Sequence, residues 1–173
     1  HVIIYDNSDV ISSCRVWYTF LYFDHSPNLV SVLDGGLKKW LKEKKETTQD
    51  IKKFQTSSYI AKENKSLVLD KDQINFNIQD KSFELIDARS KERFLGLHPE
   101  PRKGLRSGNI TGSKNIPFTE FININDRTFK KKDELISIFQ KNKLDPNKKI
   151  AFTCGSGLTA CVLGLTNSII SGR

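Results

Sequence analysis

The sequence predicts an α/β protein with a mainly parallel sheet flanked by helices. Short apolar runs rich in β-branched residues are typical of buried strands, and four are present: residues 2–5, 29–33, 83–86 and 149–153. Helical segments alternate with these runs, which favours parallel pairing because each helix returns the chain to the same end of the sheet. An internal repeat supports the prediction. Residues 2–8 resemble residues 150–156, because each segment is a predicted strand followed by a polar turn before a helix. In this alignment Asp6 corresponds to Cys154.

Each predicted helix has a local signal. Helices are expected at residues 10–23, 37–45, 91–94, 133–143 and 157–170. The first follows a turn of Asp, Asn and Ser, which are good helix caps, and the second follows a glycine turn. Residues 68–77 are compatible with a strand or a short helix. Polar residues 46–58 are predicted to be a linker, and the Pro- and Gly-rich residues 96–113 a long loop of the kind that often carries function.

Composition narrows the possible partners. The 173 residues suffice for one ordinary domain or two small ones. Acidic residues interrupt the lysine runs that produce the net charge of +8, so a solvated surface is favoured over a nucleic-acid site. No apolar run approaches the ~20 residues of a membrane span, so neither nucleic acid nor membrane is expected as a partner. His25 and His98 lack Cys or His neighbours at metal-ligand spacing, so we expect no metal.

The segment from Cys154 to Cys161, CGSGLTAC, is the most informative. A cysteine ends an apolar strand, glycines flank Ser156, and a helix begins at once. Such a loop can direct backbone N–H groups at the sulfur, and the helix N-terminus adds partial positive charge, so both favour the nucleophilic thiolate. A sulfurtransferase, a cysteine phosphatase, a redox site or a merely buried cysteine remain open. The loop lacks the arginine that a phosphatase needs for its phosphate dianion.

This loop resembles the active-site loop of the 3-mercaptopyruvate sulfurtransferases, which are two-repeat members of the rhodanese family. Further similar segments are Leu85–Arg89, Arg93–Gly96, Pro99–Arg102 and Ser107–Pro117, with Val2–Asp6, Arg15–Trp17 and Val32–Gly36 resembling the first repeat. The resemblance implies a rhodanese-like fold with two tandem repeats, both incomplete. Residues 1–58 are then the later half of the non-catalytic repeat plus a linker, and residues 59–173 are the catalytic repeat, truncated at its C-terminus.

The resemblance also implies roles for individual residues. Cys154 is the nucleophile that carries a persulfide, with Ser156 as a second catalytic candidate or a simple loop cap. Arg93 and Arg102 hold the substrate carboxylate and carbonyl, a task suited to the fork of the guanidinium. The remaining substrate-binding candidates are Gly155, Gly157, Leu158 and Thr159. Asp87 and Arg89 are expected to form a structural pair that fixes the substrate loop. Cys161 is expected to pack in the core, and Cys14 to be a core or surface residue without a chemical role.

The implied activity is transfer of sulfur from 3-mercaptopyruvate to a thiol such as thioredoxin, or to cyanide. Relatives that use thiosulfate usually carry basic residues in the loop, so their absence here favours mercaptopyruvate. The alternatives are a thiosulfate sulfurtransferase and a non-enzymatic rhodanese-like binding module. Three cysteines cannot all pair within the chain, which predicts a reducing compartment, cytoplasmic or mitochondrial.

The chain is expected to be a piece of a longer protein. It begins with His1 and contains no methionine. The matched segments cover neither repeat completely, and the acidic residue and histidine that the family proposes for proton relay have no counterpart. We therefore expect little turnover from such a piece alone.

Overall fold

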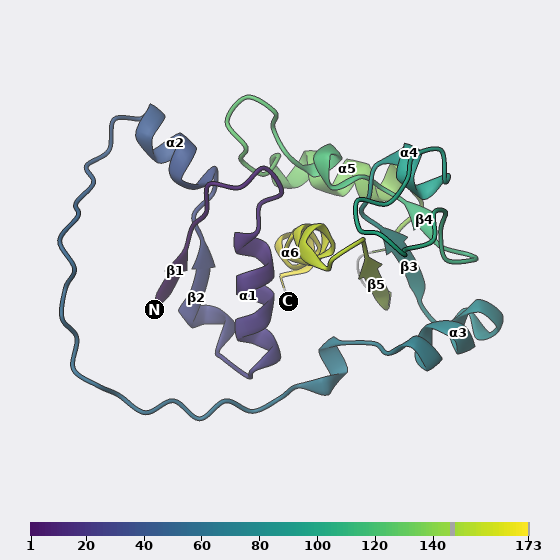
Figure 1. Cartoon of the computed structure of the whole chain (residues 1–173), viewed down its shortest axis with the longest axis horizontal. Helices are drawn as coiled ribbons and strands as arrows, with labels where there is room; N and C mark the ends of the chain where they lie inside the picture. The colour runs from purple at the N-terminus through teal and green to yellow at the C-terminus, as the bar shows by residue number, and fades with distance from the viewer. Residues whose placement is uncertain (146–147, 173) are drawn as a thin grey trace.

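The computed structural model describes residues 1–145 and 148–172, which form an α/β fold with two parallel sheets (Figure 1). The strands are β1 (Val2–Ile4), β2 (Val30–Val32), β3 (Glu84–Asp87), β4 (Lys114–Asn115) and β5 (Ile150–Thr153). β1 pairs with β2 in one sheet, and β3 lies between β4 and β5 in the other. All of these pairings are parallel, as the alternation of apolar runs and helices predicted.

The helices are α1 (Ser13–Tyr22), α2 (Gly36–Lys42), α3 (Lys71–Asp80), α4 (Lys91–Phe94), α5 (Lys132–Lys141) and α6 (Leu158–Ser171). Short 3-10 turns occur at Pro27–Leu29, Lys65–Leu67 and Phe118–Phe121. In the part of the chain that the structure describes, no helix has the length and apolar character needed to cross a membrane.

Two helices begin more than one residue away from the predicted start. α1 begins three residues later than predicted because the carboxylate of Asp6 accepts a hydrogen bond from the Ser13 N–H at 2.5 Å, which fixes the start of the helix there. Ile11 before it has φ of 50°, a left-handed conformation that interrupts a helix. The ambiguous segment 68–77 contains the start of α3, where Asp70 and Gln73 form a reciprocal capping box.

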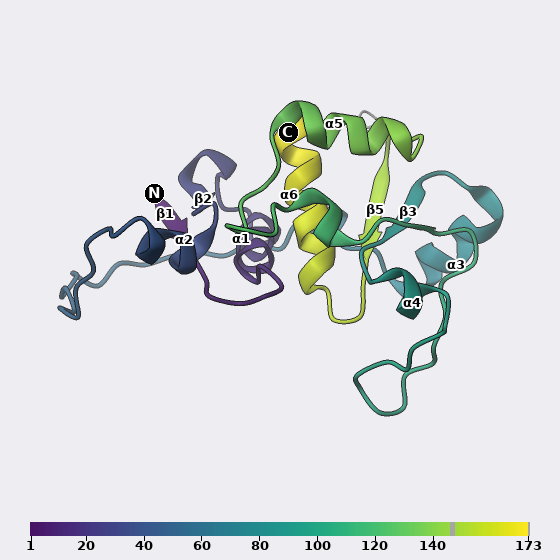
Figure 2. The ribbon, with the colours of Figure 1, turned by 90° about the horizontal axis from the view of Figure 1, so that it is seen from above.

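The layers follow one another as sheet β1–β2, α1, α6 and sheet β4–β3–β5, an order visible in both Figure 1 and Figure 2. Ile4, Trp17 and Val30 pack α1 onto the first sheet. Cys14 of α1 and Cys161 of α6 belong to a cluster that joins the two helices. The two cysteines are 0% and 7% exposed, so the prediction that Cys161 packs in the core is confirmed, and Cys14 is a core residue rather than a surface one.

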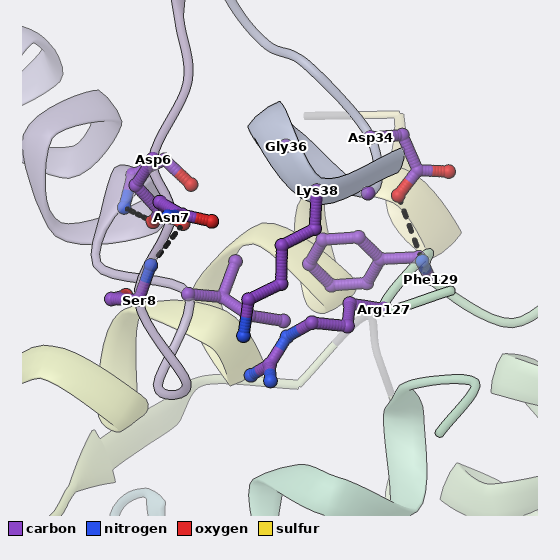
Figure 3. Close-up of a pocket in the computed structure, with 11 residues that line it drawn as sticks. Asp6, Asn7, Ser8, Asp34, Gly36, Lys38, Arg127 and Phe129 are labelled. Atoms are coloured by element: carbon purple, nitrogen blue, oxygen red, sulfur yellow. Dashed lines mark hydrogen bonds between the residues drawn. The ribbon is translucent and has the colours of Figure 1, made fainter. Parts of the chain in front are cut away.

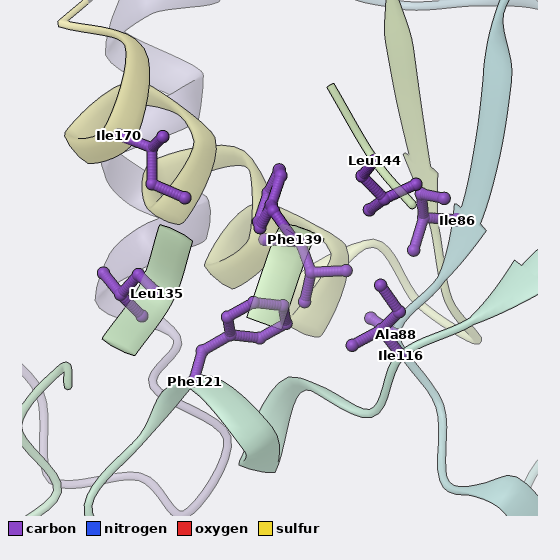
Figure 4. Packing of buried hydrophobic residues seen from close by; sticks show 9 residues of the cluster. Ile86, Ala88, Ile116, Phe121, Leu135, Phe139, Leu144 and Ile170 are labelled. Atoms are coloured by element: carbon purple, nitrogen blue, oxygen red, sulfur yellow. The ribbon is translucent and has the colours of Figure 1, made fainter. Parts of the chain in front are cut away.

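The largest apolar cluster lies between the second sheet and helices α5 and α6 (Figure 4). Its members are Ile86, Ala88, Ile116, Phe121, Leu135, Phe139, Leu144, Leu163 and Ile170. Each large side chain buried in this way contributes roughly 1.5–3 kcal/mol. α6 is therefore buried on two sides, by α1 and by the second sheet, which explains why its sequence contains no charged residue.

Two long segments contain neither helix nor strand. Residues 43–64 connect α2 to the 3-10 turn at Lys65–Leu67, in agreement with the predicted linker at residues 46–58. Residues 96–113 form the predicted loop between α4 and β4. Figure 2 shows this loop protruding from the same side of the molecule as the turn between β5 and α6. The loop and the cysteine turn are thus presented on one side of the fold.

Candidate active site

Cys154 lies directly after β5, at the carboxyl end of the second sheet. β5 pairs with β3 so that Thr153 is level with Asp87, and Asp87 is level with Asn115 of β4. Carboxyl ends of parallel strands are where α/β proteins present their ligand sites, because the connecting loops begin there. The cysteine is half-buried, while Cys14 and Cys161 are buried. Among the three thiols, Cys154 therefore has the access that a nucleophile requires.

The turn from Cys154 to α6 directs backbone donors at the sulfur. The N–H of Gly157 donates to Cys154 Sγ at 3.0 Å. Gly157 has φ of 79°, in the left-handed region, where a side chain is disfavoured. It also forms the N-terminal cap of α6, so the positive end of that helix lies next to the thiol.

The pKa of Cys154 is lowered from the ordinary thiol value by the groups around it. Burial is the largest single influence and raises the pKa, because it disfavours the charged form. Hydrogen bonds from the Thr159 side chain and from the N–H groups of Ala160, Ser156 and Gly157 oppose it and together prevail. Burial raises the pKa of Cys161, by contrast, to about 11. Cys154 is thus the thiol that the fold prepares as a thiolate.

This difference leads to a prediction for pH dependence. A lowered pKa means that the thiolate persists to lower pH, so alkylation of Cys154 by iodoacetamide should reach half its maximal rate below the ~8.5 of a free cysteine. Replacing Thr159 by valine keeps the shape but removes the hydroxyl donor, so the midpoint should rise. Peptide-level mass spectrometry of the alkylated chain across pH measures both midpoints.

A Thr166→Val variant, changed at a hydroxyl that bonds within α6, is the matched control. Equal midpoints in wild type and Thr159→Val would contradict the assigned role.

Arg93 packs directly against the cysteine turn. A Cβ atom added to Gly155 would lie 2.6 Å from Arg93 Nη2, so only glycine leaves room for the guanidinium there. Arg93 also donates to both oxygens of Glu100, at 3.1 Å from Nε and 2.5 Å from Nη2. The structure therefore brings Cys154, Gly155 and Arg93 together, as the sequence reasoning expected.

A buried charge network supports the long loop. Arg89 forms ion pairs with Asp87 and with Glu100, both at 2.7 Å, and donates to the carbonyl of Gly108 at 2.7 Å. Side chains of Asp87 and Glu100 are each 3% exposed and that of Arg89 is 9% exposed. The expected structural pairing of Asp87 with Arg89 is thus confirmed, and it does anchor the loop. Sequence reasoning placed Glu100 in the family-like segment Pro99–Arg102 but predicted no role for it. In the structure its carboxylate bridges Arg89 and Arg93.

The other predicted site residues have varied surroundings. Arg102 is exposed on the loop of residues 96–113, and Ser156 is exposed at the tip of the cysteine turn. Leu158 and Thr159 are half-buried in the first turn of α6. The substrate-binding role of Arg102 and the catalytic role of Ser156 stay predictions. Among the described residues, no group of three or more His, Cys, Asp or Glu side chains gathers in a way that could hold a metal ion.

Arg15 of α1 is a neighbour of the site that sequence reasoning missed. Its Nη1 donates to the carbonyl of Gly157 at 3.4 Å, and the same nitrogen occupies the space that a Cβ of Gly157 would need. The contact spans 142 positions of sequence. Only the glycine at 157 hinted that something approaches the backbone closely, and a glycine does not identify its neighbour.

The turn after β1 is the structural counterpart of the cysteine turn, and it has no thiol. Asp6 accepts hydrogen bonds from the Ser8 N–H, the Ser12 hydroxyl and the Ser13 N–H. Its carboxylate is therefore occupied in capping α1. Figure 3 shows the surrounding cavity of about 10 Å³, in which Arg127 and Phe129 also lie. At that size the cavity holds about one water molecule and is too small for a substrate.

Comparison with known proteins agrees with this geometry. The family described as Rhodanese-like domain matches residues 70–168, more than half of the chain. The chain belongs to the rhodanese family. This rhodanese-family chain is 40% identical over 168 residues to 3-mercaptopyruvate sulfurtransferase from Mus musculus, covering 95% of the chain and 56% of the relative. It is equally similar, with the same coverage, to thiosulfate sulfurtransferase from Rattus norvegicus.

A solved structure shows the same rhodanese fold. The crystal structure of SseA from Escherichia coli, described as a 3-mercaptopyruvate sulfotransferase, superposes with a TM-score of 0.83 at 29% identity. The match covers 98% of this chain and 62% of SseA. The family resemblance inferred from the cysteine loop is thus confirmed. The chain spans about half the length of the curated relatives it matches, 56% of each of the two named above.

Proposed function

We propose that the protein transfers sulfane sulfur from 3-mercaptopyruvate through a persulfide on Cys154. The observation that carries this proposal is the thiol held at the carboxyl end of β5 by the Gly157 N–H at 3.0 Å, with its pKa lowered by surrounding donors. A thiolate in this setting attacks sulfur readily, and the donors that stabilise it also suit the anionic outer sulfur of a persulfide.

The reaction has two half-steps. The Cys154 thiolate attacks the sulfur of mercaptopyruvate, the carbon–sulfur bond breaks, and its electron pair leaves as the enolate of pyruvate, which takes up a proton. An acceptor thiolate, such as that of thioredoxin, then attacks the outer sulfur and restores the Cys154 thiolate. Cyanide accepts the sulfur in the same way and leaves as thiocyanate. Neither half-step calls for a metal or an organic cofactor.

The arginines supply the binding chemistry in this proposal. Nε and Nη2 of Arg93 donate to Glu100, so we assign Nη1 to the hydrogen bond with a substrate oxygen. Arg102 lies on the loop that protrudes on the side of the cysteine turn. In this proposal the two arginines hold the carboxylate and the carbonyl of mercaptopyruvate while its sulfur faces Cys154. We further propose that residues 1–58 and 59–173 belong to successive repeats and that the protein works in the cytoplasm or the mitochondrion.

The decisive experiment is persulfide detection. The purified chain is exposed to 3-mercaptopyruvate or, separately, to thiosulfate, and the peptide containing Cys154 is examined by mass spectrometry for the addition of one sulfur atom. We expect the addition with mercaptopyruvate, and faster than with thiosulfate. Faster loading by thiosulfate would favour the thiosulfate sulfurtransferase, for which the equal identity to that relative is the supporting observation. No loading by either donor would favour the non-enzymatic module.

A second prediction concerns the two arginines. Replacing Arg93 or Arg102 by alanine removes charge-assisted hydrogen bonds worth roughly 1.5–3 kcal/mol. The second-order rate constant for persulfide formation from mercaptopyruvate should therefore fall about 10- to 100-fold in each variant. Arg106→Ala, at an exposed arginine of the same loop, is the matched control and should retain the wild-type rate. Wild-type rates in both variants would show that these arginines do not hold the substrate.

A further inference from the structure

The backbone of Gly157 lies between the nucleophile and the N-terminal half of the chain. Its N–H donates to Cys154 Sγ at 3.0 Å, and its carbonyl accepts from Arg15 Nη1 at 3.4 Å. The thiol of Cys161 donates to the same carbonyl at 3.1 Å. One residue thus borders the reactive sulfur on one side and a guanidinium from α1 on the other.

Arg15 is an exposed residue whose guanidinium lies over Gly157. The guanidinium fills the space beside the α-carbon of Gly157 that any side chain would claim. α1 itself is held against α6 by the cluster that contains Cys14 and Cys161. Because α1 is anchored against α6, the helix presents this positive charge beside the cysteine turn.

The charges of the two arginines at this turn are balanced differently. Arg93 on the Gly155 side is neutralised by both oxygens of Glu100. Arg15 on the Gly157 side is bonded to a neutral carbonyl, and no ion pair among the described residues includes it. Burial raises the pKa of Cys161 and the positive charge of Arg15 opposes that rise, so its field reaches the thiol of Cys161 in α6.

We propose that Arg15 is an anion-attracting residue of the sulfur site, contributed by the N-terminal half of the chain. It supplies next to Cys154 the positive charge that the loop sequence lacks, and so favours the approach of negatively charged sulfur donors to the thiolate. The inference rests on the proposed function only in taking Cys154 as the reactive thiol. It adds that the site favours anionic over neutral sulfur donors.

The test compares an anionic and a neutral reagent at the same sulfur. Iodoacetate and iodoacetamide alkylate thiolates by the same displacement and differ in charge. Their rate constants at Cys154 are measured at low ionic strength by peptide-level mass spectrometry in wild type and in the series Arg15→Lys, Arg15→Gln and Arg15→Glu. Arg106→Gln is the matched control on an exposed arginine.

We expect the ratio of the iodoacetate rate to the iodoacetamide rate to follow the charge at position 15. It should stay near the wild-type value in Arg15→Lys, fall about two- to five-fold in Arg15→Gln, as for an exposed charge, and fall further in Arg15→Glu. Added salt should reduce these differences because exposed charges are screened. A purely structural role of Arg15 would change both rates alike and would not order the variants by charge.

An unchanged ratio in both Arg15→Gln and Arg15→Glu would overturn the proposal. So would a fall of the same size in Arg106→Gln. Alkylation does not involve sulfur transfer, so its outcome is independent of the persulfide experiment. A charge-dependent ratio without persulfide formation would refute the proposed function and leave this inference standing, and the reverse combination would refute the inference alone.

Discussion

Replacing Cys154 by serine should reduce persulfide formation from mercaptopyruvate by at least about 100-fold. A serine hydroxyl stays protonated at neutral pH and forms no bond to sulfur that could hold a persulfide, whereas the thiolate is stabilised by the Gly157 N–H and the Thr159 side chain. The measurement is the rate of sulfur addition by intact-protein mass spectrometry, supplemented by release of pyruvate.

Cys14→Ala is the control for this change. Cys14 is fully buried between α1 and α6, and burial raises the pKa of its thiol, so it should contribute nothing to sulfur transfer. We expect the control to load sulfur within a few-fold of wild type. Loss of sulfur loading in Cys14→Ala, with loading retained in Cys154→Ser, would show that the nucleophile is Cys14 and not Cys154.

The second large effect is expected on stability, from Asp87→Ala. This change leaves Arg89, whose side chain is 9% exposed, with one of its two carboxylate partners. Removing one partner of a buried pair typically costs about 3–5 kcal/mol because the remaining charge is poorly compensated. The free energy of unfolding from urea titration should fall by that amount, with an unchanged slope. The loop of residues 96–113 should also become more susceptible to proteolysis, because Arg89 anchors it.

The matched control is Asp9→Ala, which also removes a carboxylate that forms ion pairs. Asp9 pairs with Lys38 and Arg127, but its side chain is 79% exposed. Water and salt screen such pairs, so the urea midpoint should stay close to that of wild type. Equal losses in the two variants would mean that burial of the Asp87 network contributes nothing to stability.

Most of the fold was predictable because its signals are local. Apolar runs predicted all of the strands longer than two residues, and the helix at α4 agrees residue for residue with the prediction. The start of α1 was missed because it depends on Asp6, which caps Ser13 from seven positions away. β4 has two residues and is too short for any periodicity to indicate it.

The site was predictable only where its chemical groups lie close together in the sequence. Cys154 and its glycines form one short motif, so the thiolate geometry followed from the sequence. Glu100 and Arg15 were missed because their contacts depend on packing between segments, across 11 positions for the pair with Arg89 and 142 positions for the bond to Gly157. Absence of a basic residue within the loop therefore does not mean absence of positive charge at the loop.

The cluster that joins α1 to α6 has a consequence for biosynthesis. Ile11 and Cys14 emerge from the ribosome nearly 150 residues before Cys161 and Val162, against which they pack. At ~5–20 residues per second, the apolar face of α1 lacks its partner for about 7–30 s. Contacts of such high sequence separation also slow folding, since a long chain segment must be ordered before they form. The nascent N-terminal half is thus an expected client of chaperones that shield exposed apolar helices until synthesis reaches α6.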